Sequence, residues 1–303
     1  MKNELNKAYI ALALVSFFWG TTYIAARIGA QGMPGLFVAG MRQFISGTLL
    51  AGYFLLRGHR IPSLSVLKQI GVQSIFLLCI SNGLITWSMQ YITGGLAAII
   101  AALMPLFIVL FTVALTNNAR ITRLMLGGLL IGFTGIVIIF YDYLGDLRDQ
   151  RFLIGVIMAV VATLSWSFGT VYGATHKPPI DILFNVGLQM WIAGAIMLLL
   201  CGVTGQYADL TTISVNSWLA LGYLIVFGSL VAYSAFVFVI DKLPPTQVSI
   251  YAYINPVVAV VAGWLLLSEK LNLHMVAGTL VTLAGVYLVN REFRKFPRNT
   301  ARS

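Results

Sequence analysis

The chain has 303 residues, of which 59% are hydrophobic and 9% are charged, and its mean hydropathy is +0.91. Soluble globular domains carry about 25% charged residues, so this composition excludes an ordinary soluble enzyme, a soluble nucleic-acid-binding domain and a disordered chain. The formal net charge of +10 agrees instead with a polytopic membrane protein, because the cytoplasmic loops of such proteins are rich in Lys and Arg.

Ten apolar segments follow one another along the chain, and each is about as long as a transmembrane helix, which needs ~20 residues. The long apolar stretch 69–119 is divided in two by Thr93-Gly94-Gly95, which is a turn signal. The connections between the segments are short, so the predicted fold is an all-α polytopic membrane protein without a soluble domain. The predicted helices are 8–28, 36–56, 70–91, 95–116, 123–141, 152–173, 182–203, 217–240, 246–267 and 273–290.

The positions of Lys and Arg predict the orientation of these ten segments. Of the 19 basic residues, 14 fall at segment ends on the side of the N-terminus and 4 fall on the other side. Arg42 lies inside the second segment. Because Lys and Arg accumulate in cytoplasmic loops, we expect a multi-pass protein of the cell inner (plasma) membrane with both termini in the cytoplasm.

The two halves of the sequence resemble each other at a nearly constant offset. Ser16-Phe17-Phe18-Trp19-Gly20 matches Thr163-Leu164-Ser165-Trp166-Ser167, 147 residues later, and Met104-Pro105-Leu106 matches Asn255-Pro256-Val257, 151 residues later. We therefore predict a first five-helix repeat at 1–146 and a second at 147–303, which ends in a basic cytoplasmic tail. Five is an odd number, so the second repeat must be inverted, and transporters with inverted repeats bind substrate near the midplane where the repeats meet.

Several of these motifs also carry a family resemblance. Phe17-Phe18-Trp19-Gly20-Thr21-Thr22-Tyr23, the Asn255-Pro256 pair, and Leu266-Leu267-Ser268-Glu269 followed by Ala284-Gly285-Val286 resemble EamA-type members of the drug/metabolite transporter superfamily. The resemblance covers nearly the whole chain. It implies alternating access through a central cavity, lined in part by the fourth and ninth helices. It also implies export of amino acids, related metabolites or toxic compounds.

Matched prolines and polar stripes are the candidate functional residues. Pro105 and Pro256 are each the eleventh residue of their predicted helix, and an interior proline frees the carbonyl four residues earlier and kinks the helix. We predict them as hinges beside the cavity.

Polar or aromatic residues at helical spacing predict the cavity wall, with interhelical hydrogen bonding as the alternative and a membrane-interface belt as the alternative for Trp. The predicted substrate-binding residues are Trp19, Tyr23, Asn82, Trp87, Trp166, Tyr233, Tyr251 and Asn255. Gln247 belongs to the same stripe as Tyr251 and Asn255.

Charged residues in or near the segments are few. Arg42 is either a functional intramembrane ion or a side chain that extends to the nearby surface or bonds to helix-end carbonyls. Arg27 is expected to be exposed at a helix end. Glu269 is expected to pair with Lys270 or to cap the last helix. No Asp or Glu lies in the middle of any segment, so compact cations are poor candidate substrates, and neutral, zwitterionic or weakly anionic molecules, including aromatic ones, are favoured.

The remaining predictions concern enzymatic activity, ligands and assembly. The chain is predicted not to be an enzyme, because the motifs of an intramembrane enzyme are missing, and multidrug efflux is the alternative transport function. No cofactor and no metal are expected. The predicted partners are a small-molecule substrate and the lipid bilayer, without nucleic acid. Glycines at 128, 132, 135, 278 and 285 permit close helix contacts, either within one chain or in a homodimer, so the oligomeric state stays open between monomer and homodimer.

Overall fold

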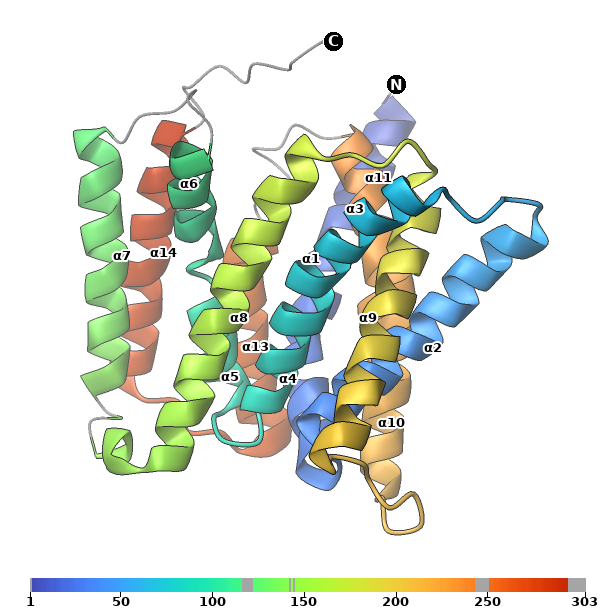
Figure 1. Cartoon of the computed structure of the whole chain (residues 1–303). Coiled ribbons are helices and arrows are strands. Elements are labelled where there is room, and N and C mark those ends of the chain that lie inside the picture. The colour runs from blue at the N-terminus through green and yellow to red at the C-terminus, as the bar shows by residue number, and fades with distance from the viewer. Residues whose placement is uncertain (1, 116–121, 142, 144, 243–250, 294–303) are drawn as a thin grey trace.

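The computed structural model describes residues 2–115, 122–141, 143, 145–242 and 251–293, and all regular structure in these residues is helical (Figure 1). The first half contains α1 (Lys2–Gly32), α2 (Gly35–Leu56), α3 (Leu64–Ser74), η1 (Ile75–Asn82), α4 (Gly83–Ser88), α5 (Gly94–Ala101), α6 (Met104–Leu115) and α7 (Arg123–Tyr141). The short η2 (Asp146–Arg148) precedes the second half, which contains α8 (Gln150–Thr175), α9 (Ile182–Thr204), α10 (Val215–Tyr223), η3 (Leu224–Val231), α11 (Ala232–Lys242), α13 (Tyr251–Leu267) and α14 (Leu273–Phe293).

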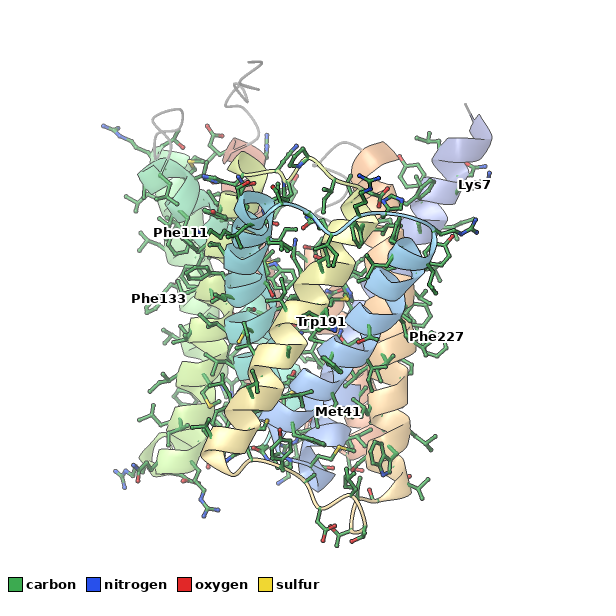
Figure 2. All side chains as sticks on the ribbon, turned by 45° about the vertical axis from the view of Figure 1, so that its right-hand side comes forward. Lys7, Met41, Phe111, Phe133, Trp191 and Phe227 are labelled. Atoms are coloured by element: carbon green, nitrogen blue, oxygen red, sulfur yellow. The ribbon has the colours of Figure 1, made fainter. Side chains whose placement is uncertain are left out.

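Most of these helices have the length and composition of membrane spans. Within the described ranges, seven helical segments are long and apolar enough to cross a membrane, and Ile254–Leu267 and Leu273–Val289 are shorter apolar helices. Helix α2 has 22 residues, but Arg42 and Gln43 lower its hydropathy. Large apolar side chains such as Phe133 and Phe227 are exposed on the flanks of the bundle (Figure 2), as lipid contact requires. The all-helical fold is thus confirmed, whereas the count of ten spans stays a prediction.

The two halves run in opposite directions. Helix α1 begins, and α14 ends, on the same face of the bundle, which we call the termini face (Figure 1). Helix α8, the first long helix of the second half, begins on the other face, which we call the opposite face (Figure 1). The division at residues 146 and 147 stays a prediction.

A helical irregularity occurs at equivalent places in both halves. η1 and η3 are π-helical stretches of 8 residues each, and they begin at Ile75 and Leu224. These positions differ by 149 residues, which is close to the offset of the sequence repeat. The π-helix is rare and often occurs at functional sites. Hydropathy periodicity carries no signal for it, so the sequence did not predict it.

Glycines bring equivalent helices of the two halves into close contact. In α2 and α9, a Cβ atom added to Gly47 or Gly194 would overlap the backbone of the other helix at Trp191 or Phe44. In α14, a Cβ atom added to Gly285 would overlap the backbone of Gly132 in α7. The glycines of α7 and α14 therefore pack against each other within one chain, which decides between the two roles that the sequence left open.

Candidate functional site

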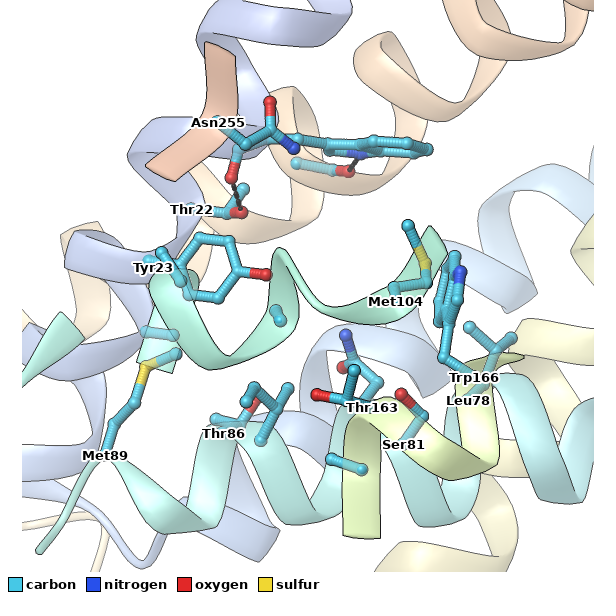
Figure 3. Close-up of a pocket in the computed structure, with 18 of the residues that line it drawn as sticks. Thr22, Tyr23, Leu78, Ser81, Thr86, Met89, Met104, Thr163, Trp166 and Asn255 are labelled. Carbon is cyan, nitrogen blue, oxygen red and sulfur yellow. Dashed lines mark hydrogen bonds between the residues drawn. The ribbon is translucent and has the colours of Figure 1, made fainter. Parts of the chain in front are cut away.

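A cavity of about 150 Å³ lies between the two halves (Figure 3). Its wall combines residues of α1, α2, η1, α4, α5 and α6 from the first half with residues of α8, α9, η3, α11 and α13 from the second. Seven of the eight predicted substrate-binding residues line it: Trp19, Tyr23, Asn82, Trp166, Tyr233, Tyr251 and Asn255. The helical spacing of the polar stripes thus selected side chains that share one cavity, although their ligand-binding role stays a prediction.

Trp87 differs from the other seven residues because it is not part of this wall. It follows Thr86, which does line the cavity, and the next residue of an α-helix points about 100° away. The Trp87 side chain is half-buried and packs against the hydrophobic core, and its backbone lies close to Gly35. Gln247, which was predicted on the same face as Tyr251 and Asn255, lies outside the described residues.

Aromatic rings from three helices form one wall of the cavity. The Trp19 ring of α1 lies 5.2 Å from that of Tyr251 and 6.0 Å from that of Tyr233, measured between ring centroids. Phe236 of α11 does not line the cavity but supports this wall, with its ring 4.8 Å from that of Trp19 and 5.5 Å from that of Tyr251. Nε1 of Trp19 donates a hydrogen bond of 3.2 Å to the carbonyl of Gly228. Trp19 is therefore an interior residue of the bundle and not a membrane-interface residue.

The two prolines have different structural effects. Helix α5 ends at Ala101 and α6 begins at Met104, so the helix that contains Pro105 is interrupted beside the cavity, where Met104 lies on the wall. Helix α13 continues through Pro256, which lines the cavity. Proline has no N–H group, and the residues whose carbonyls are freed, Ala101 and Ala252, both line the cavity. The first half therefore carries a helix break where the second carries a continuous helix.

Several polar side chains of the predicted stripes hold helices together or bond to their own helix. In the amide orientation that satisfies its surroundings, the Asn255 nitrogen lies 3.0 Å from the Tyr251 carbonyl and 2.9 Å from the Ser16 carbonyl. The Asn255 amide thus ties α13 to α1 while the residue also lines the cavity. The hydroxyls of Thr163 and Ser167 donate to carbonyls four residues earlier, at 2.8 Å and 2.7 Å, as expected for Ser and Thr in membrane helices.

Arg42 points into the cavity and does not extend to the membrane surface, whereas its functional role stays a prediction. Its side chain is buried and lines the cavity, and Nε donates a 2.9 Å hydrogen bond to Oγ of Ser229 in η3. Gly228 leaves room for the guanidinium, because a Cβ atom there would lie 3.0 Å from one of its terminal nitrogens. The spacing of residues in α2 does not show which of its faces packs against the other helices. The sequence alone therefore did not distinguish a position in the cavity from extension toward the membrane surface.

Gln43 is a cavity residue that the sequence did not single out. Its Nε2 donates to Oδ1 of Asn82 at 3.1 Å, and its Oε1 is buried and accepts no hydrogen bond from the described part of the chain. Gln43 follows Arg42 and matches Met190 in the internal repeat, and both Gln43 and Met190 line the cavity. The repeat was therefore the signal that would have identified it.

Hydrogen bonds join the two halves near the opposite face. The Glu269 carboxylate accepts from the backbone N–H groups of Gly94 and Gly95 at 3.0 Å and 3.2 Å, so it caps α5. Asn272 caps α14 instead, through a 2.8 Å hydrogen bond from the N–H of Met275. The predicted pairing of Glu269 with Lys270 or α14 was therefore wrong, because the loop folds back onto the other half.

Arg27 was expected to be exposed at a helix end, and this prediction was wrong. The side chain is half-buried and donates a hydrogen bond to the carbonyl of Met89 within the same half.

Comparison with known proteins identifies the family of this fold. The family model described as "EamA-like transporter family" matches residues 6–141 and 153–291. The chain belongs to this family. It is a multi-pass membrane transporter, and the resemblance read from its motifs is confirmed.

Individual relatives and a solved structure agree with this assignment. The Escherichia coli K12 protein named "Uncharacterized inner membrane transporter YedA" is 34% identical over 271 residues, which cover 89% of this chain and 86% of the relative. The Bacillus subtilis protein named "Uncharacterized transporter YoaV" is 25% identical over 297 residues, which cover 93% and 96%. A crystal structure described only as that of a protein has a TM-score of 0.64 and 18% identity and covers 97% of this chain and 99% of its own; it shows the fold alone.

Proposed function

We propose that this transporter exports small neutral, zwitterionic or weakly anionic metabolites across the inner membrane. Amino-acid-like molecules, including aromatic ones, are the proposed substrates, and alternating access through the central cavity is the proposed mechanism. The observation that carries the proposal is a mixed polar and aromatic cavity whose wall draws equivalent residues, such as Trp19 and Trp166, from both halves. Inverted-repeat transporters bind their substrates at such a junction.

The size and chemistry of the cavity support this substrate class. A cavity of about 150 Å³ is comparable with an engineered protein cavity that accommodates benzene. Aromatic rings offer flat apolar contact, and Asn and Gln offer both hydrogen-bond donors and acceptors. None of the residues on the described wall is Asp or Glu, so a cationic substrate finds no counter-charge there.

Location and assembly are part of the same proposal. Location in the inner membrane is supported by the name of the Escherichia coli relative, and the charge bias supports cytoplasmic termini. The glycines of α7 and α14 are used within the chain, which favours a monomer over a homodimer built on these helices. The substrate and the lipid bilayer remain the proposed partners.

Efflux of toxic aromatic compounds is the second candidate function. The ring cluster of Trp19, Tyr233, Phe236 and Tyr251 favours it, because aromatic walls accept flat ligands of varied structure. Substrate breadth separates the two candidates: a metabolite exporter selects among amino-acid-like molecules, whereas an efflux pump transports unrelated aromatic compounds at similar rates.

Flux from proteoliposomes tests the proposal. The purified full chain is reconstituted, and efflux of amino acids, organic acids, uncharged aromatic compounds and a compact quaternary ammonium ion is compared with efflux from protein-free liposomes. We expect protein-dependent efflux of one or more neutral, zwitterionic or anionic compounds. Faster efflux of the quaternary ammonium ion than of any of these would refute the proposed substrate class, and no protein-dependent flux would refute the function.

A further inference from the structure

The cavity contains a buried positive charge without a negative partner among the described residues. Arg42 donates from Nε to the neutral hydroxyl of Ser229, and none of the described residues of the cavity wall carries a carboxylate. A guanidinium has five N–H donors in a planar fork, and the described residues accept a hydrogen bond from Nε only, so the donors of the two terminal nitrogens remain available to a ligand. Removing an ion from water is costly unless it is paired, and a bound anion would provide the missing pair.

A buried acceptor beside this charge also lacks a partner. Oε1 of Gln43 accepts no hydrogen bond within the described chain, and the Gln43 side chain is 1% exposed. Buried polar atoms are almost always hydrogen-bonded. Arg42 and Gln43 both line the cavity, so a ligand that reaches both side chains would meet unused donors and an unused acceptor.

We propose that Arg42 and Gln43 are the specificity-determining residues of this transporter and select a monocarboxylate with a neutral O–H or N–H donor near its carboxylate. The carboxylate would bind the guanidinium fork, which matches carboxylate geometry in a bidentate manner. The neutral donor would bind Oε1 of Gln43. The inference rests on the proposed transport function and narrows its substrate class to hydroxy acids and N-acylated amino acids.

Electrostatics ranks the competing ligands. A monoanion neutralises the cavity, whereas a zwitterion brings a carboxylate and an ammonium group and leaves the positive charge of Arg42 uncompensated. An ammonium group placed near Gln43 would also lie close to the guanidinium, and like charges repel. An uncharged amide lacks the charge-assisted hydrogen bonds. The expected order of affinity is hydroxy acid, then simple acid, then zwitterion, then amide.

The proposal also supplies a driving force for export. Moving a negative charge outward across an inside-negative membrane is favourable, so a monoanion leaves the cell without a proton relay. This agrees with the absence of Asp and Glu from the middle of every predicted span. Efflux of the preferred ligand from proteoliposomes should therefore accelerate when an inside-negative potential is imposed with potassium and valinomycin.

Binding of four matched probes tests the recognition pair. The probes share one skeleton: 3-phenyllactate, 3-phenylpropionate, phenylalanine and 3-phenylpropanamide. A wider panel of aliphatic and aromatic carboxylates, each measured with its primary amide, covers carbon skeletons of other sizes and shapes. Binding to the full chain in nanodiscs is read from tryptophan fluorescence, because Trp19 and Trp166 line the cavity, and from ligand-induced thermal stabilisation.

Four variants separate recognition from a structural role. Arg42→Gln should lose about 10- to 150-fold in affinity for acids, as expected for a lost hydrogen bond to a charged group, and should no longer distinguish acids from amides. Arg42→Lys should keep the preference for acids at reduced affinity. Gln43→Met should weaken 3-phenyllactate but not 3-phenylpropionate. Arg148→Gln is the matched control, because it removes the same charge from an exposed residue of η2 and should change nothing.

Each outcome supports or overturns the proposal. The expected ranking, lost in Arg42→Gln and partly restored in Arg42→Lys, supports it. Stronger binding of amides, zwitterions or cations to the wild-type chain, unchanged acid binding in Arg42→Gln, or no binding by any acid of the panel overturns it. If amides or zwitterions are transported equally well by wild-type and Arg42→Gln, this inference fails while the proposed function stands; absence of all transport defeats the proposed function itself.

Discussion

Glu269 is predicted to hold the cavity closed at the opposite face. It lies in the loop between α13 and α14, and its two carboxylate oxygens accept hydrogen bonds of 3.0 Å and 3.2 Å from Gly94 and Gly95 at the start of α5. These bonds join the second half of the chain to the first. If alternating access separates the halves at this face, they must break when the cavity opens there.

The strength of this connection follows from its chemistry. A hydrogen bond to a charged group contributes ~1.5–3 kcal/mol, and a carboxylate at a helix N-terminus adds up to about 1 kcal/mol when partly exposed. Glu269 is half-exposed, so solvent weakens both the hydrogen bonds and the interaction with the helix dipole. We therefore take ~1.5–3 kcal/mol as the total free energy of the contact between Glu269 and α5. Glu269→Ala should therefore shift the population toward the state open at the opposite face by about 10- to 150-fold.

Cysteine labelling measures this shift. The native Cys79 and Cys201 are first replaced by Ala, and the reporter is Thr86→Cys in α4, on the cavity wall. A membrane-impermeant methanethiosulfonate is applied to intact cells. Because only the open state reacts, the rate of labelling is proportional to its population, and it should rise about 10- to 150-fold in Glu269→Ala if that state is rare in the parent.

A matched acid in another loop provides the control. Asp209 precedes α10, and among the described residues its carboxylate accepts hydrogen bonds from the backbone N–H and the hydroxyl of Thr211, at 3.0 Å and 2.7 Å. Asp209→Asn should label at the parental rate. Equal rates in Glu269→Ala and the parent, at equal membrane abundance, would show that the capped helix is not part of the closure.

Four further predictions follow from the fold and the cavity. Tyr251→Ala removes ring contacts worth ~0.5–1.5 kcal/mol each and should weaken export several-fold, whereas Tyr287→Ala, at an exposed residue of α14, should not; equal losses would make Tyr251 a general packing residue. Pro256→Ala should impair transport more than membrane abundance, and full activity would remove it from the mechanism. Gly128→Leu should lower the melting temperature through a clash worth ~1–3 kcal/mol, whereas Gly127→Leu, with nothing within 4 Å of its Cβ position, should be neutral; the reverse order would contradict the α7–α14 contact. A C-terminal alkaline phosphatase fusion should be inactive and a C-terminal green fluorescent protein fusion fluorescent, and the opposite pattern would reject the cytoplasmic termini.

The sequence by itself determined the features that depend on local periodicity and composition. Apolar segments near the thickness of a bilayer predicted the helical membrane fold, and the internal repeat and its motifs indicated the transporter family. The polar stripes selected residues that line one cavity: Trp19, Tyr23, Asn82, Tyr251 and Asn255. These predictions succeeded because a membrane helix must satisfy its own backbone hydrogen bonds, so the spacing of residues along it directly gives the face on which each side chain lies.

The tertiary structure decided which helices meet and therefore what each face contacts. Arg42 is charged in any fold, but only the packing of α2 against η3 turns it into the cavity. Glu269 caps a helix that begins 175 residues earlier in the chain, and Trp87 turns away from the wall that its neighbour Thr86 lines. Such contacts join residues far apart in sequence, and the spacing within one helix holds no information about the partner that the other half brings to it.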